Sequence, residues 1–149
     1  VVKPAADGLM ELYLESITAA RESGDPAEAT SQGNEGTELV LKYIYENFDV
    51  FKLIFCHSAG TEYERYFDEL AEIEEKYYRE FVKQFSRREN MVSDFFIHVI
   101  CRTGWSYIYE VVSHDLSYDE AQIFMKSIRE FCFAGWGKVL GQNYEDLGL

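Results

Sequence analysis

The sequence predicts an all-α domain of about six helices, and three observations support this fold class. The chain has 149 residues, a length that suits one domain with its own hydrophobic core. Its two prolines, Pro4 and Pro26, lie at the beginning of the chain, so proline interrupts no helix after that point. From residue 35 onward, apolar side chains recur every three or four positions, which is the period of one face of an α-helix.

The first third of the chain predicts two helices separated by a loop. Residues 4–22 read as a helix, because their apolar side chains follow helical spacing behind a proline suited to a first turn. The next stretch is rich in Gly, Ser, Pro, Asp and Asn and has no large apolar residue, so we expect an exposed loop over 23–34. Helical spacing returns at Glu35, and a break is expected near Asn47.

The apolar run over residues 48–55 fits two kinds of structure. Phe48, Phe51 and Phe55 lie on one face of a helix, whereas Phe51, Leu53 and Phe55 alternate as in a strand. A single strand would have no partner in an otherwise helical chain, so we predict a short helix.

The clearest amphipathic helix spans residues 61–85. Thr61 and Glu64 match a capping box at its start, and its charged face reads as solvated surface. Residues 86–90 are expected to form a turn. The apolar face is made by Tyr63, Tyr66, Phe67, Leu70, Ile73, Tyr77, Phe81 and Phe85.

Two long segments, 91–113 and 118–140, are apolar over more than half of their circumference. A helix that is apolar on two faces must be buried on two faces, and the domain core covers only one of them. We therefore predict a homodimer in which these two helices and their mates form a four-helix bundle; a buried hairpin in a monomer is the alternative. The expected interface residues are Phe96, Ile100, Thr103, Tyr107, Ile128, Phe131 and Gly135.

The charge of the chain restricts its partners. The formal net charge is −13, spread as −6 over 1–59, −3 over 60–90 and −4 over 91–149. An evenly acidic chain lacks the basic face that phosphate contacts require, which argues against nucleic-acid binding by these residues and against docking on an anionic membrane. No apolar run is long enough to span a bilayer. Cys56, Cys101 and Cys132 have apolar neighbours and no Cys-x-x-Cys spacing, so we expect free thiols in a reducing, cytoplasmic location.

The stretch GTELVLKYIYENFDVFKLIFCHSAGTEYERYFDELAEIEEKYYREFVKQF, followed by two long apolar helices, resembles the regulatory domain of the TetR/AcrR family of bacterial transcriptional regulators. The resemblance is strongest over 35–90 and extends through helix order and helix length to the whole chain. It implies an effector-sensing and dimerisation domain over 1–149, in which 1–22 corresponds to the linker helix behind a DNA-binding head. The helix-turn-helix of that head is absent from this sequence, so any repression of an operator and any contact with DNA would belong to the full-length protein.

Aromatic residues are abundant enough to predict a small-molecule pocket. The chain has 11 Tyr, 11 Phe and 2 Trp, and buried tyrosines need partners for their hydroxyl groups. Aromatic side chains with a few polar tips are typical of an apolar ligand site, and the resemblance implies one between 35–46, 48–56, 61–85 and 91–113. We expect an enclosed cavity that touches Tyr63, Phe67 or Trp105 and binds a hydrophobic or aromatic effector. For each aromatic residue alone, plain core is the alternative, and for His57 it is a surface or capping role. The candidate ligand-binding residues are Tyr43, Phe48, Phe51, Phe55, His57, Tyr63, Tyr66, Phe67, Trp105 and Tyr109.

Catalysis and metal binding have weaker support in the sequence. Neighbouring side chains such as Cys56 and His57 diverge on a helix, so they are not expected to act as a catalytic pair. His98 follows Asp94 by four residues and His114 follows Glu110 by four, but each pair offers only two metal ligands. We therefore expect no enzyme activity, no metal and no cofactor. A metal-dependent helical enzyme and a ligand-free dimerisation module are the alternative functions.

Overall fold

The computed structural model describes residues 1–86 and 92–141, and these fold into six α-helices with no strand among them. The prediction of an all-α fold of about six helices is confirmed, whereas the dimeric bundle stays a prediction because the structure holds one chain. Apart from Ser86, the turn expected at 86–90 lies outside the described residues. The helices are α1 (Val2–Arg21), α2 (Pro26–Glu46), α3 (Phe48–Cys56), α4 (Tyr66–Phe85), α5 (Asp94–Ser113) and α6 (Tyr118–Leu140).

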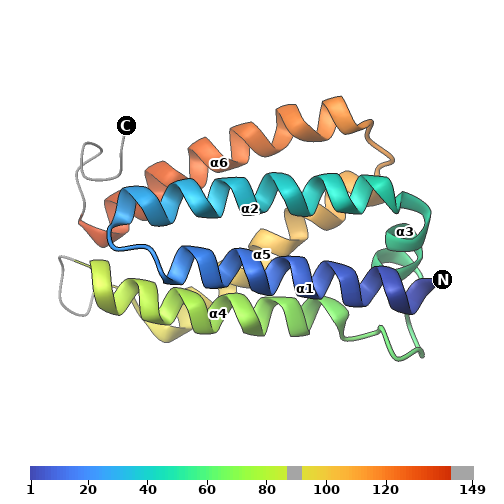
Figure 1. The fold of residues 1–149 in the computed structure, drawn as a ribbon, viewed down its shortest axis with the longest axis horizontal. Coiled ribbons are helices and arrows are strands. Elements are labelled where there is room, and N and C mark those ends of the chain that lie inside the picture. The colour runs from blue at the N-terminus through green and yellow to red at the C-terminus, as the bar shows by residue number, and fades with distance from the viewer. Residues whose placement is uncertain (87–91, 142–149) are drawn as a thin grey trace.

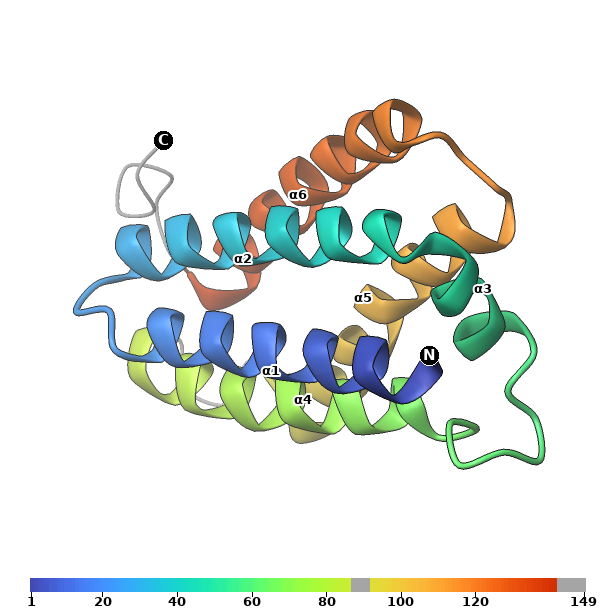
Figure 2. The same cartoon turned by 45° about the vertical axis from the view of Figure 1, so that its right-hand side comes forward.

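The helices form a bundle in which α1 occupies the middle of one layer. In Figure 1, α1 lies between α2 and α4, and all three run along the long axis of the molecule. Helix α5 passes behind them against α4, and α6 lies along the outer side of α2 (Figures 1 and 2). The short helix α3 covers the end of the bundle near the N-terminus and packs on α5. The three helices α3, α4 and α5 therefore meet at that end.

The loop expected over 23–34 is wrong from Pro26 onward, because α2 begins there. The Asp25 side chain caps this helix by accepting a hydrogen bond from the backbone N–H of Glu28 at 2.9 Å, and Pro26 occupies the first turn. Two residues beyond the expected loop, at Gly36, α2 packs closely on α1. A Cβ added to Gly36 would stand 2.7 Å from the Cβ of Ser16, so only glycine fits at this crossing.

The remaining helix boundaries follow the sequence with one further correction. The break at Asn47 and the short helix over 48–55 are confirmed by α2 and α3. The helix expected from residue 61 begins only at Tyr66. Thr61 and Glu64 cap a turn instead: the Thr61 hydroxyl accepts from the backbone N–H of Tyr63, and the Glu64 carboxylate accepts from the N–H of Gly60.

The hydrophobic core runs through all six helices, and aromatic hydroxyl groups are tied into it. Tyr43 of α2 donates to the backbone oxygen of Ala5 at 3.1 Å, and Tyr66 of α4 donates to that of Ala6 at 2.7 Å. Both bonds fix the first turns of α1 to its two neighbours. The largest fully buried side chains are Phe51, Leu9, Ile44, Leu70, Leu140, Val111, Val112 and Cys101.

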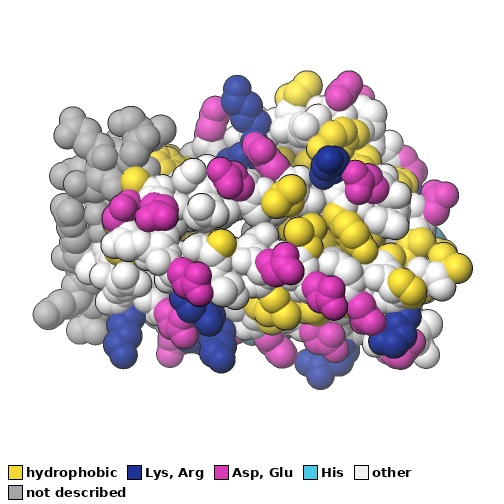
Figure 3. Space-filling view, in the orientation of Figure 1, with side chains coloured by type: hydrophobic (Ala, Val, Ile, Leu, Met, Phe, Trp, Pro, Cys, Tyr) yellow, Lys and Arg dark blue, Asp and Glu magenta, His cyan; other side chains and the backbone are white. Residues whose placement is uncertain are grey.

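Acidic side chains are scattered over the surface with apolar patches between them. Figure 3 shows Asp and Glu over the whole described part of one face, in agreement with the even charge distribution of the sequence. Within residues 1–86 and 92–141, no helix has the length and apolar character needed to cross a membrane.

Candidate functional site

A cavity of about 220 Å³ lies where α3, α4 and α5 meet, and it is open to solvent on one side. The sequence predicts an enclosed cavity that touches Tyr63, Phe67 or Trp105. The cavity found here touches two of these residues, Phe67 and Trp105, but is only partly enclosed. Its lining consists of Phe55, Phe67, Asp68, Ala71, Arg102, Trp105, Ser106 and Tyr109.

Four aromatic rings make the apolar wall of the cavity. Phe67 stands at the centre: its ring stacks on Phe55 of α3 with 4.4 Å between centroids, and lies 6.0 Å from Tyr109 and 6.4 Å from Trp105 of α5. Helical spacing places these residues together, since Phe67 and Ala71 are one turn apart on α4, as are Trp105 and Tyr109 on α5. Such a wall offers flat apolar surface from three helices to a bound ring.

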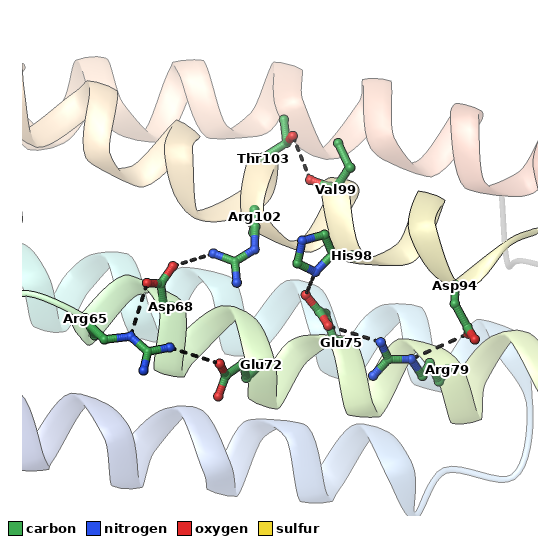
Figure 4. Close-up of polar contacts among 10 residues, drawn as sticks. All are labelled: Arg65, Asp68, Glu72, Glu75, Arg79, Asp94, His98, Val99, Arg102 and Thr103. Carbon is green, nitrogen blue, oxygen red and sulfur yellow. Dashed lines mark hydrogen bonds and ion pairs between the residues drawn. The ribbon is translucent and has the colours of Figure 1, made fainter.

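An ion-pair network between α4 and α5 forms the polar side of the cavity (Figure 4). Arg102 Nη1 donates to Asp68 Oδ1, and Arg65 Nε lies 3.6 Å from the other carboxylate oxygen, Oδ2. Arg65 also pairs with Glu72 at 3.6 Å. The hydrogen bond from Arg102 lowers the pKa of Asp68, so this carboxylate is charged throughout the neutral range. The Nε atom of Arg102 is buried and finds no hydrogen-bond partner in the described part of the chain.

A second polar group on the same two helices continues the network away from the cavity (Figure 4). The side chain of Glu75 is buried, and its Oε1 lies 2.6 Å from His98 Nδ1. Arg79 pairs with Glu75 at 3.2 Å and with Asp94 at 3.5 Å. These contacts join α4 to α5 electrostatically along much of their length, so the cavity lies beside a firmly connected helix pair.

Behind Trp105, three polar side chains from different helices lie together in the interior. The rings of Tyr13 and Trp105 meet edge to face, 5.1 Å apart, and Glu74 Oε2 approaches α5 beside Gly104. Within the described residues, neither the Tyr13 hydroxyl nor the indole nitrogen of Trp105 has a hydrogen-bond partner. The Trp105 N–H acts on the Glu74 carboxyl, yet it does not meet it with hydrogen-bond geometry.

Burial dominates the protonation of this interior group. It raises the pKa of Glu74 to about 8 and that of Tyr13 well above its usual range. It also raises the pKa of the neighbouring Tyr78 and of the Cys101 thiol. The Glu74 carboxyl is therefore largely neutral at pH 7, because the burial of a part of this side chain disfavours its charge and no ion pair with a cation offsets the cost in the described structure.

Four of the ten candidate ligand-binding residues line the cavity, namely Phe55, Phe67, Trp105 and Tyr109. The structure places the other six elsewhere. Tyr43 and Tyr66 bind the backbone of α1, and Phe51 is a fully buried core residue. Phe48 packs on Tyr45, Tyr63 packs on Tyr66, and His57 is an exposed residue at the end of α3.

Sequence reasoning missed the polar lining of the cavity. Asp68, Arg102 and Ser106 belong to it, and Ala71 lies beside them in the lining, although none of the four was a candidate. For Arg102 a signal exists in the sequence, because it is the only Lys or Arg between residues 91 and 113 and interrupts an apolar segment. A lone cation on such a helix needs either solvent or an anionic partner.

The predicted interface residues divide into packed and exposed groups. Phe96 packs on Trp136 at 5.7 Å and Tyr107 on Phe124 at 6.4 Å, so both fill the space between α5 and α6 of the same chain. Ile128 packs against the core, and Ile100 and Thr103 are half-buried. Phe131 and Gly135 are exposed on α6. Three more exposed apolar side chains, which were not candidates, accompany them: Phe95, Val99 and Ile123.

Metal and thiol chemistry find little support in the geometry. Among the described residues, no group of three or more His, Cys, Asp or Glu side chains is arranged to hold a metal ion. His98 pairs with Glu75 rather than with Asp94, and His114 lies 3.1 Å from Glu110 on the surface. Cys56, Cys101 and Cys132 are free thiols.

Comparison of the chain with protein-family models, curated proteins and solved structures finds no match.

Proposed function

We propose that this domain is the effector-sensing and dimerisation part of a TetR-like transcriptional regulator, and that it binds a hydrophobic or aromatic small molecule in the cavity between α3, α4 and α5. The observation that supports the proposal most strongly is the wall of four aromatic rings contributed by three helices. One aromatic ring is enough to fill a packed position in a core. Several rings that converge on a space open to solvent are typical of a ligand site.

The position of Trp105 supports a sensing role for the cavity. One part of this side chain lines the cavity, and its ring also meets Tyr13 of α1. A ligand that prefers one arrangement of Trp105 therefore shifts the population of α1 positions by as much as its affinities for the two arrangements differ. In the proposed regulator, α1 is the helix that carries this change to a DNA-binding head.

Exposed apolar side chains on the last two helices support the homodimer. Phe95 and Val99 are one turn apart on α5, and Ile123 and Phe131 share one face of α6 because they are eight residues apart. Three of these four side chains, Phe95, Ile123 and Phe131, keep 70% or more of their surface exposed in the single chain. A second copy would cover them. The free thiols support a reducing, cytoplasmic location for the whole regulator.

Ligand binding is tested by thermal shift of the purified domain against a library of small aromatic and aliphatic compounds. A few related aromatic compounds should raise the melting temperature in a concentration-dependent way. The Ser106→Phe variant, which places a ring at the open side of the cavity, should abolish this effect. Its control is Ser31→Phe, an exposed serine on α2. A library without any stabilising compound, or equal responses of both variants, would show that the cavity is not a ligand site.

The regulatory part of the proposal has its own test. The natural polypeptide that contains this domain should carry a basic helix-turn-helix segment before Val1, and the full-length protein should bind a specific operator whose affinity changes with the ligand. If the full-length protein carries another kind of domain, or binds no operator, the proposed regulatory role is wrong. The ligand site is tested separately by thermal shift.

A further inference from the structure

We infer that the ligand of this cavity is a small aromatic carboxylate whose anionic group binds Arg102, displacing the Asp68 side chain from it. This inference rests on the proposed function, because it names the chemical class of the ligand at the proposed site. The juxtaposition that carries it is a cavity with four aromatic rings on one side and an incompletely bonded guanidinium group on the other.

The hydrogen bonds of Arg102 are incomplete. A guanidinium group has five N–H donors in a planar fork that matches a carboxylate. The structure gives Arg102 one acceptor, Asp68 Oδ1, which Nη1 reaches, while its buried Nε finds none within residues 1–86 and 92–141. A buried donor without an acceptor is unfavourable. A ligand oxygen that reaches Nε once the Asp68 side chain has moved aside would therefore gain an interaction that Arg102 now lacks.

Asp68, in contrast, has a cation at each of its two oxygen atoms. Arg102 binds Oδ1, and Arg65 lies 3.6 Å from Oδ2. When an incoming carboxylate takes Arg102, Asp68 keeps Arg65 as its partner. A cationic ligand would have to compete with both arginines for Asp68. The exchange therefore favours an anionic ligand over a cationic one, even though the two charges of the Asp68–Arg102 pair are equal in size.

One further polar group of the lining, the Ser106 hydroxyl, is already used. The Ser106 hydroxyl donates to the backbone oxygen of Arg102 at 3.2 Å. Arg102 is the one cationic donor of the lining, beside the neutral donors of Tyr109 and Trp105, so it is the lining group best suited to an anionic ligand.

The net charge of −13 repels anions at long range, but ordinary salt screens charges separated by more than about 8–10 Å. The ions nearest the site, Arg65 and Arg102 with Asp68 and Glu72, balance one another.

The size of the cavity limits the apolar part of the ligand. Its volume is about 220 Å³. A cavity of about 150 Å³ holds benzene, whereas drug-sized ligands need roughly 300 Å³ or more. One or two rings with a short carboxylate arm therefore fit, with the rings against Phe67 and Trp105 and the carboxylate at Arg102.

The test compares three probes that differ only in the polar group, by isothermal titration calorimetry at pH 7. The probes are phenylacetate, phenylacetamide and phenethylamine, together with the naphthyl analogue of each. The carboxylate should bind at least about tenfold more tightly than the amide and the amine in one or both series. An amide that binds as tightly as the acid, an amine that binds best, or no binding by any probe would overturn the inference.

Variants of the ion pair locate the effect. Arg102→Gln should lower the affinity for the carboxylate probe by about tenfold or more and leave the affinity for the amide unchanged. Asp68→Asn should raise the affinity for the carboxylate probe, because the side chain that competes for Arg102 loses its charge. If Arg102→Gln does not fold, this second variant tests whether the carboxylate binds at Arg102. Equal effects of Arg102→Gln on acid and amide would contradict the inference.

Failure of this inference is distinguishable from failure of the proposed function. If Ser106→Phe abolishes binding of neutral aromatic compounds while Arg102→Gln has no effect on any probe, the cavity is a ligand site but its ligand is not a carboxylate. If Ser106→Phe has no effect on any compound, the site itself is wrong.

Discussion

The indole ring of Trp105 meets the phenol ring of Tyr13 edge to face, with 5.1 Å between the centroids and 84° between the planes. This contact joins the wall of the cavity to α1 through a single pair of rings. It also buries two polar atoms, the Tyr13 hydroxyl and the Trp105 indole nitrogen, without a hydrogen-bond partner in the described structure. The pair is therefore a place where stability and function can be separated by experiment.

Tyr13→Phe should not destabilise the domain and should raise its free energy of unfolding. The substitution removes a buried hydroxyl without a partner, and such a group costs about 1–3 kcal/mol. The matched control is Tyr66→Phe, which removes a hydroxyl that donates to Ala6 O at 2.7 Å and should destabilise by about 1 kcal/mol. Urea unfolding measures the free energy of unfolding of both variants. Similar losses in the two variants would show that the Tyr13 hydroxyl is bonded in solution.

Glu74 should make the stability of the domain fall as pH rises from about 4.5 to about 8. Its pKa is about 8 in the folded state against 4.5 for the ordinary group, so the folded state binds the proton more tightly. The stabilising contribution is complete below pH 4.5, declines between these values and is absent above pH 8.

Glu74→Gln should remove this pH dependence. At pH 8 the variant should be more stable than the wild type by about 1–3 kcal/mol, a range reduced for the partial exposure of Glu74, and at pH 5 nearly equal to it. Melting temperatures over this pH range measure the difference, with Glu69→Gln on the exposed side of α4 as control. If the melting temperatures of Glu74→Gln and the wild type change with pH in parallel, Glu74 is not the source of the pH dependence.

Two glycines of α2 should respond in opposite ways to alanine. Gly36→Ala places a Cβ 2.7 Å from Ser16 Cβ, which forces α1 and α2 apart and should destabilise the domain by about 1–3 kcal/mol. A Cβ added at Gly33 has no neighbouring atom within 4 Å. Gly33→Ala should therefore stabilise the domain by about 1 kcal/mol, because alanine has the higher helix propensity. Thermal unfolding compares the two, and a stabilising Gly36→Ala would mean that α1 and α2 do not pack this closely.

Removal of the exposed apolar side chains of α6 should abolish the proposed homodimer. The wild-type chain should sediment at twice its mass of 17.4 kDa, and an Ile123→Lys, Phe131→Lys double variant should sediment as a monomer with an unchanged helix content. Leu39→Lys, at an exposed leucine of α2, is the control and should remain dimeric. A monomeric wild type at micromolar concentration would contradict the dimer.

Helix periodicity predicts most of the fold because each long helix buries one face. It fails over 26–34, where the buried residue of α2 is the small Ala29, and small residues in a sequence resemble a loop. It also fails at 61–65, where Thr61 and Glu64 supply capping groups to a turn instead of a helix. Capping residues in a sequence identify the atoms that make the cap, but they do not show whether a turn or a long helix follows.

The cavity is predictable only in part, for a similar reason. The aromatic character of Phe67 and Trp105 indicates that they are buried, but it does not distinguish a cavity wall from a core such as that around Phe51. The Asp68–Arg102 pair joins residues 34 positions apart, and that pairing depends on the way α4 and α5 cross. Charged residues on apolar segments are accordingly the more specific signal of the site.

The hydroxyl groups of Tyr43 and Tyr66 hold consecutive backbone oxygens of α1, those of Ala5 and Ala6. Consecutive residues lie about 100° apart around a helix axis, so the two bonds reach α1 from different sides. The helix can neither roll about its axis nor slide along it without losing one of them. A displacement of α4 would therefore either break the Tyr66–Ala6 hydrogen bond or carry the first turns of α1 with it.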